Sequence, residues 1–198
     1  MANKISICNN ALNRLGANSI TTFADGSKAA NLCNVFYEQE RKTMLRTFLW
    51  NFAVKRVVLS NNGNTPEFGL AYEFDVPTDC LRTWKLENPY VIWKEENGKI
   101  LSSMEEIELY YIYDVDDVDS MSETFKNALE YKLASTLSYP LIQSSTIQST
   151  MYSLYKEEIK DMRTVESQIG TPESANDNLW VDSRRTPGAS SGRREYYW

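Results

Sequence analysis

The stretch MLRTFLWNFAVKRVVLS, residues 44–60, decides the fold because the spacing of its apolar residues changes within it. Before it, apolar residues recur every three or four positions, which predicts a long amphipathic helix from Asp25 or Ser27 to about Leu49. Residues Phe52–Leu59 are instead rich in β-branched and apolar side chains, which is typical of a strand. A helical region therefore ends, and a β region begins, within this one stretch.

The β region continues as short strand-like runs separated by turns. Asn61–Pro66 has the composition of a loop. Asn97-Gly98 favours a type I′ hairpin turn, because both residue types tolerate positive φ. The strand-like runs after the loop are Leu70–Val76, Cys80–Leu86, Tyr90–Lys94, Lys99–Leu101 and Ile107–Tyr113. We expect these runs to form a small antiparallel β module over residues 52–118.

Apolar residues recur at helical spacing both before and after this module in the sequence. A first helix is predicted over about residues 4–15. After the module, Ser120 and Glu123 match a capping box, and the helix that they open is expected to end at Pro140. The last helix is expected over residues 145–169.

The predicted fold class is therefore α+β, a four-helix bundle with an inserted small antiparallel β module and an extended C-terminal tail. The expected domains are residues 1–51 with 119–170 as a ring-forming helical bundle, 52–118 as the β domain, and 171–198 as a docking tail.

The tail is rich in Ser, Gly, Asn, Pro and Arg and has no regular apolar spacing, so by itself we expect it to be disordered. It nevertheless carries arginines and ends in three aromatic residues, which are the residue types that anchor protein interfaces. The predicted docking residues are Arg184, Arg185, Arg193, Arg194, Tyr196, Tyr197 and Trp198. Contact of the arginines with nucleic-acid phosphates, or a tail without a partner, is the alternative.

Composition excludes several classes of function. The chain has 198 residues and no histidine, which excludes Ser-His-Asp and Cys-His nucleophile systems and histidine zinc sites. Its 21 basic and 27 acidic side chains give a net charge of −6, unlike the basic excess of general nucleic-acid binders. No signal-peptide pattern and no long apolar run is found, so we expect a protein folded in the cytoplasm, with its three cysteines reduced.

The acidic run Asp114–Asp119 is the clearest candidate for a metal site. Read as a calcium-binding loop, it lacks the required glycine at its sixth position, Asp119, and the required glutamate at its twelfth, Phe125. We therefore expect a solvated loop before a helix N-terminus, where negative charge is favourable. No catalytic, cofactor-binding or metal-binding residue is predicted.

Four segments carry motifs of a known family. They are residues 11–17 (ALNRLGA), 45–53 (LRTFLWNFA), 72–82 (YEFDVPTDCLR) and 125–137. In these segments the chain resembles the tail tubular protein A family of short-tailed, podovirus-type bacteriophages, the adaptor ring between portal and tail nozzle. The resemblance extends over most of the chain up to about Thr171, and its motifs are structural rather than catalytic.

This resemblance implies a virion structural protein and no enzyme. Family members form a homo-oligomeric twelvefold ring that docks on the portal protein and receives the tail nozzle protein. Double-stranded DNA would pass through the lumen during genome ejection without specific binding, and neither a cofactor nor a membrane is implied. The protein would belong to the virion tail or neck, assembled in the host cytoplasm.

The same analogy suggests where the partners bind. The docking residues of the tail would contact the portal. The loops at Asn62, Gly63, Asn97 and Gly98 would face the nozzle. Two other classes of function stay open: a metal-dependent phage enzyme that cleaves phosphodiesters with the acids of Asp114–Asp119, and a monomeric cytosolic interaction module with a docking tail.

Overall fold

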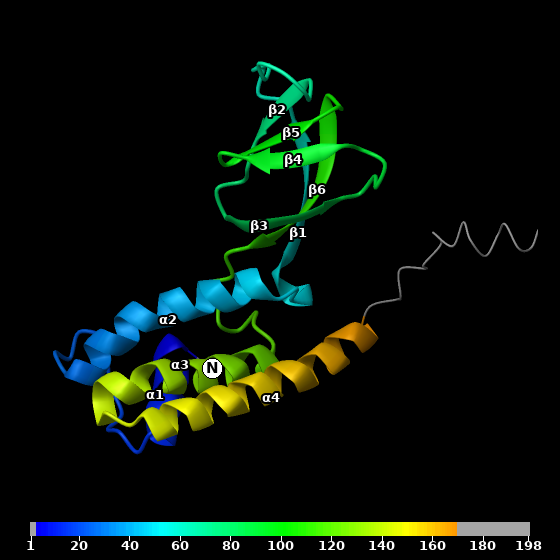
Figure 1. Cartoon of the computed structure of the whole chain (residues 1–198). Helices are drawn as coiled ribbons and strands as arrows, with labels where there is room; N and C mark the ends of the chain where they lie inside the picture. Colours follow the sequence, from blue (N-terminus) through cyan, green and yellow to red (C-terminus); the bar gives the residue numbers. More distant parts are fainter. Residues whose placement is uncertain (1–2, 170–198) are drawn as a thin grey trace, which may run out of the picture.

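The computed structural model describes residues 3–169, in which a β module stands on one side of a helical bundle (Figure 1). The helices are α1 (Lys4–Arg14), α2 (Lys28–Thr47), α3 (Glu123–Ile142) and α4 (Ser145–Ile169). A short 3-10 helix at Asn51–Ala53 precedes the first strand. The strands are β1 (Val54–Ser60), β2 (Tyr72–Asp75), β3 (Cys80–Leu86), β4 (Trp93–Glu96), β5 (Lys99–Ser102) and β6 (Glu106–Tyr113).

Helix α3 is the centre of the bundle, with α1, α2 and α4 packed around it (Figure 1). Its buried apolar residues include Phe125, Leu129, Leu133 and Leu137, and it also buries Glu130. A helix that is apolar on most sides is stable only when other elements cover those sides. The composition of α3 therefore matches its central position.

Local signals set the ends of the first two helices. Gly16 follows α1 with φ +67, and the N–H of Ala17 donates to the carbonyl oxygen of Leu12 at 3.0 Å. This is a Schellman motif, which uses a glycine in the left-handed region to end a helix. The Oγ of Ser27 accepts the N–H of Ala30 at 3.1 Å and caps α2.

Both predicted ends of α3 are shifted. Its N-cap is Ser122, whose Oγ accepts the N–H of Phe125 at 3.2 Å, rather than Ser120. Pro140 lies inside the last turn, and the helix ends before Gln143, which has φ 52. A proline so near the C-terminus removes a single N–H donor, and the helix therefore continues past it for two residues.

The β module is larger than the small insertion expected from the sequence. Its strands form two three-stranded antiparallel sheets, with strand orders β1-β6-β3 and β2-β5-β4. The module has its own hydrophobic core, formed by Phe74, Leu86, Ile100, Ile107, Leu109 and Tyr111.

The predicted fold class, a four-helix bundle with a small antiparallel β module, is therefore wrong in its proportions. The chain is a mixed α+β fold in which the two sheets form a body with a core of their own. Alternating residues identify each strand separately. They do not show how the strands divide between two sheets, because that depends on pairing between residues distant in sequence. The extended tail of the same prediction lies outside the described residues.

Trp50 lies where the bundle meets the β module. Its side chain is 0% exposed, and its indole N–H donates to the carbonyl oxygen of Met44 at 3.1 Å. The ring centroid lies 4.7 Å from that of Phe125, in an edge-on arrangement. Phe52 completes the cluster, with its ring centroid 5.3 Å from that of Phe125. The residues that change the chain from helix to strand thus pack on the first turn of α3.

A contact from β3 closes the same junction. Arg82 Nη1 donates to the carbonyl oxygen of Arg46, in the last turn of α2, at 2.8 Å. Carbonyl groups at a helix C-terminus have no partner within the helix and carry partial negative charge. The guanidinium group therefore satisfies the end of α2 and holds sheet β1-β6-β3 against it.

Replacing Trp50 with alanine tests the importance of this junction. We expect Trp50→Ala to lower the free energy of unfolding by ~3–5 kcal/mol, because it removes a fully buried ring and leaves a cavity. Urea unfolding followed by circular dichroism measures the change. Phe68→Ala is the control, since Phe68 is 88% exposed, and its effect should stay within ~0.5 kcal/mol. Equal stability of Trp50→Ala and the wild type would contradict the prediction.

Candidate interaction surfaces

The residues predicted to dock on the portal all lie outside the described residues. They are Arg184, Arg185, Arg193, Arg194, Tyr196, Tyr197 and Trp198. The predicted nozzle-facing residues, by contrast, all lie in described loops of the β module.

Asn62 and Gly63 lie in the loop between β1 and β2, which is held on β2. The backbone N–H of Asn62 donates to the carbonyl oxygen of Glu73 at 2.9 Å, and its side-chain amide donates to Glu73 Oε1 at 2.8 Å. Two consecutive Asx turns set the loop conformation: Asn61 accepts the N–H of Gly63 at 3.1 Å, and Asn62 accepts that of Asn64 at 3.0 Å.

Asn97 and Gly98 form the turn between β4 and β5, and the predicted hairpin is confirmed. Their φ angles are 49 and 71, as a type I′ turn requires. The flanking residues Glu96 and Lys99 are paired across the two antiparallel strands.

The two loops meet in one polar cluster around Asp75, the last residue of β2. Lys99, next to the hairpin turn, contacts the Asp75 carboxylate and lies 3.9 Å from Glu73 Oε1. From the other loop, the side-chain amide of Asn62 lies 3.4 Å from Asp75 Oδ1. The structure therefore brings Asn62, from one predicted loop, and Lys99, next to the other predicted turn, to the same carboxylate group on β2.

These contacts favour the ionised form of both acids of the cluster. The Lys99 ammonium group and then the Asn62 amide lower the pKa of Asp75. Hydrogen bonds from the amides of Asn62 and Asn64 lower the pKa of Glu73. The cluster offers a fixed set of carboxylate and amide groups to a partner.

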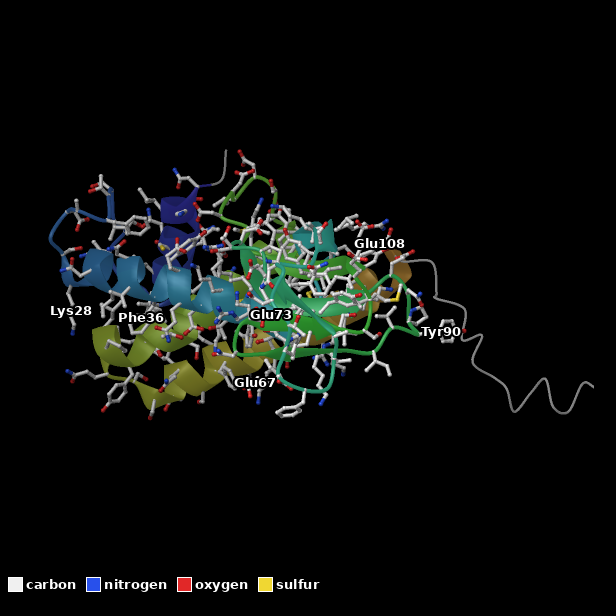
Figure 2. The ribbon with its side chains drawn as sticks, turned by 90° about the horizontal axis from the view of Figure 1, so that it is seen from above. Lys28, Phe36, Glu67, Glu73, Tyr90 and Glu108 are labelled. Atoms are coloured by element: carbon white, nitrogen blue, oxygen red, sulfur yellow. The ribbon has the colours of Figure 1, made fainter. Side chains whose placement is uncertain are left out.

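Sequence analysis did not single out a set of exposed apolar side chains on the same module. Tyr90 and Phe68 are each 88% exposed, and Tyr90 projects away from the ribbon (Figure 2). Among the described residues, the most exposed large apolar side chains of the module are Val58, Phe68, Tyr90, Ile92 and Met104, whereas the bundle shows Val35, Tyr139 and Tyr152 on three separate helices. Exposed aromatic residues are enriched in protein interfaces.

A late strand start explains why two of these residues were missed. The sequence predicts a strand from Tyr90, but β4 begins only at Trp93. Tyr90 and Ile92 therefore lie in a loop, where the carbonyl oxygen of Ile92 accepts the N–H of Ser103 at 3.3 Å. Pro89 is the local signal for this loop, because proline disfavours a central strand position.

The acidic run Asp114–Asp119 connects β6 to α3, and its first acids are paired rather than only solvated. Asp114 Oδ1 lies 2.6 Å from Arg41 Nη1, on α2. Asp116 Oδ1 lies 2.6 Å from Lys4 Nζ, on α1. The run therefore ties the connection to two helices of the bundle.

Arg41 is the centre of this network, and its side chain is 1% exposed. Its Nη2 lies 2.6 Å from Glu38 Oε2, and Nη1 also donates to the carbonyl oxygen of Val115. Lys42 adds a second positive charge, 3.0 Å from Asp114 Oδ2. A buried guanidinium group is stable only when carboxylates and hydrogen-bond acceptors lie close to it. Both Nη atoms of Arg41 have such partners, whereas its buried Nε has none among the described residues.

The network also shifts the pKa values of its acids. Burial disfavours ionisation of Asp114 and Glu38, but hydrogen bonds and charge from their basic neighbours outweigh it, so both pKa values lie below their ordinary values. The pKa of Arg41 is raised, because its bonds to Glu38 and Asp114 outweigh the cost of burial. The acidic run thus acts as counter-charge for the bundle.

Among the residues whose side chains the structure describes, no group of three or more cysteine, aspartate or glutamate side chains is arranged to hold a metal ion. None of the described helices combines the length and the hydropathy that crossing a membrane requires.

No model of a known protein family matches the chain, and a search of the curated proteins finds no similar one.

Replacing Arg41 tests the buried charge network. We expect Arg41→Met to lower the free energy of unfolding at pH 7 by ~2–3 kcal/mol, because Asp114 and Glu38 lose their charged hydrogen-bond donor but keep Lys42 and Lys4 as partners. Lys42→Met is the control: Lys42 is 41% exposed and pairs with the same Asp114, and its loss should cost at most ~1 kcal/mol. Urea unfolding measures both variants.

The pH dependence separates the charge effect from lost packing. Glu38 and Asp114 have lowered pKa values in the folded protein, so their contribution is complete at neutral pH. It is lost as pH falls below their ordinary pKa values of 4.5 and 3.8 and through the folded ones. The stability of Arg41→Met should therefore fall less steeply between pH 6 and pH 3 than that of the wild type, in buffers chosen to span that range. An unchanged acid dependence would contradict the network's role.

Proposed function

We propose that the chain is a virion structural protein, a head-to-tail adaptor of a short-tailed bacteriophage. It forms a homo-oligomeric twelvefold ring between the portal and the tail nozzle and surrounds part of the channel for genome ejection. It belongs to the tail or neck of the virion and is assembled in the host cytoplasm. The resemblance of residues 11–17, 45–53 and 72–82 to tail tubular protein A supports this class of protein.

The observation that carries the proposal is that two bodies with different surfaces are joined by buried contacts. The bundle and the β module have separate hydrophobic cores. Buried side chains stabilise the two connections between them, Trp50 at the connection from α2 to β1 and Arg41 at the connection from β6 to α3. An adaptor needs such an arrangement, because it must bind one partner at each end and keep both in register.

The side chains of each part of the chain indicate which partner it binds in this proposal. The β module, with the polar cluster around Asp75 and the exposed Phe68, Tyr90 and Ile92, faces the nozzle. The bundle forms the ring. The arginines and aromatic residues at the C-terminus, from Arg184 to Trp198, dock on the portal.

The charge of the chain suits a DNA channel. Residues 54–113 hold six basic and ten acidic side chains. Phosphate contacts with arginine and lysine would hold DNA in place, whereas an acidic surface lets it slide. Double-stranded DNA therefore passes through the lumen without specific binding.

Selective loss of each partner tests the proposal. Truncation after Gly192 removes the last two arginines and the three aromatic residues, and we expect at least a tenfold loss of portal binding with nozzle binding unchanged. The variant Tyr90→Ala/Ile92→Ala should show the reverse, because it removes exposed apolar side chains of the module only. Co-sedimentation with purified portal and nozzle rings measures both. Unchanged portal binding by the truncated chain would refute the tail assignment.

Assembly and metal binding separate this proposal from the two other classes. With the portal present, cryo-electron micrographs should show rings of the adaptor, whereas a monomeric interaction module would form none. Isothermal titration with Mg²⁺, Mn²⁺ and Ca²⁺ should show no tight stoichiometric binding, because Asp114 and Asp116 are already neutralised by basic side chains. Tight binding of one ion per chain would favour the metal-dependent enzyme.

A further inference from the structure

The outer face of sheet β1-β6-β3 has no partner within the described chain. Alternation along the strands directs Val57 and Leu109 into the core of the module. Arg56, Val58 and Glu108 alternate with them and are exposed. In Figure 2, Glu108 is seen on the outside of the module. This face therefore presents both charged and apolar side chains to the outside.

The first row of this face is cationic and aromatic. Arg56 on β1 is directly opposite Tyr110 on β6, and its guanidinium carbon lies 4.8 Å from the centroid of the tyrosine ring. On the other side of β6, Lys85 Nζ lies 5.2 Å from the same centroid. The ring of Trp84 meets that of Tyr110 edge-on at 5.9 Å. Arginine, tyrosine and tryptophan are the residues that most often dominate interface energies.

The second row is acidic and contains one exposed apolar residue. Val58, 57% exposed, is directly opposite Glu108. Glu87 lies beside Glu108, since its N–H donates to the carbonyl oxygen of Glu108 at 2.9 Å. A hollow of about 300 Å³ lies between the two rows, lined by residues of both.

We propose that this face pairs with the same face of a second copy of the chain. The two rows lie two residues apart along the strands, which is about 6.8 Å. A twofold axis between the rows, parallel to them, places the cationic row of each copy over the acidic row of the other. Arg56 of each copy then reaches Glu108 of the other, and the two Val58 side chains are covered.

Charge complementarity favours a second copy over an unrelated partner. A surface that carries both signs in adjacent rows is complementary to itself under a twofold rotation, which is the symmetry of most protein dimers. A surface made for a basic partner would need no cationic row. Three short strands per copy make a small interface, so the pair is reversible.

This pairing does not depend on the proposed function. If the chain is an adaptor, pairing covers part of the module in free subunits, and ring assembly has to separate the pair. The test uses the full chain without portal or nozzle, so its outcome is independent of partner binding.

Analytical ultracentrifugation of the full chain over a wide concentration range tests the pairing. The average mass of the wild type should rise toward twice the 22.8 kDa of one chain. Arg56→Glu and Glu108→Arg should each weaken pairing at least about tenfold, because each puts like charges face to face. The variant that combines both should regain pairing, because the exchanged charges match again across the twofold axis.

Lys94→Glu is the matched control. It makes the same charge change as Arg56→Glu at an exposed position of β4, in the other sheet, and should pair like the wild type. Circular dichroism verifies that each variant is folded. A wild type that stays at 22.8 kDa at every concentration would overturn the proposal. So would single variants that pair normally, or a double variant that pairs no better than the single ones.

Discussion

Burial of Trp50 against Phe125 is the contact on which the arrangement of the two bodies depends. It joins the end of α2 to the beginning of α3, and these two points are the places where the chain enters and leaves the β module. The indole N–H is satisfied by Met44, so the large ring is buried without leaving a polar group unpaired. Without this contact, the two connecting segments and smaller contacts, such as that of Arg82 with the end of α2, would have to hold the module on the bundle.

Ion pairs stabilise the second connection between the two bodies, the one from β6 to α3. The connection after β6 is rich in acids, and a run of like charges would by itself repel and extend. Arg41 lies buried beneath it and binds Asp114 together with a backbone carbonyl group of the run. The run is therefore a structural counter-charge for α2, although its composition is also that of a candidate metal site.

The β module and the helical bundle differ in the side chains that they expose. Exposed aromatic and apolar side chains gather on the module, where the two sheets leave loops and one outer face uncovered. The bundle surface carries only scattered ones over the described residues. A molecule whose two ends expose different side chains suits an adaptor. A sheet face with cationic and acidic side chains in adjacent rows suits reversible pairing of two copies before assembly.

Much of the local structure was predictable from sequence, because it depends on neighbours along the chain. The start of α2, expected at Asp25 or Ser27 from their capping ability, lies at Ser27. The turn at Asn97-Gly98, expected because both residue types tolerate positive φ, is confirmed. Pro140 misled the prediction of a helix end, since the cost of proline depends on how much helix follows it.

The rest required the tertiary structure. That the strands form two sheets with their own core, that Asn62 and Asn97 belong to loops joined through Asp75, and that Tyr90 is exposed all depend on pairing between distant residues. The same is true of Asp114, because no spacing in the sequence shows that its partner is Arg41. Sequence determined the type and order of the elements, since those depend on local propensity and spacing. Tertiary structure alone decided which charges are neutralised and which apolar residues stay exposed, because burial is a property of the folded chain as a whole.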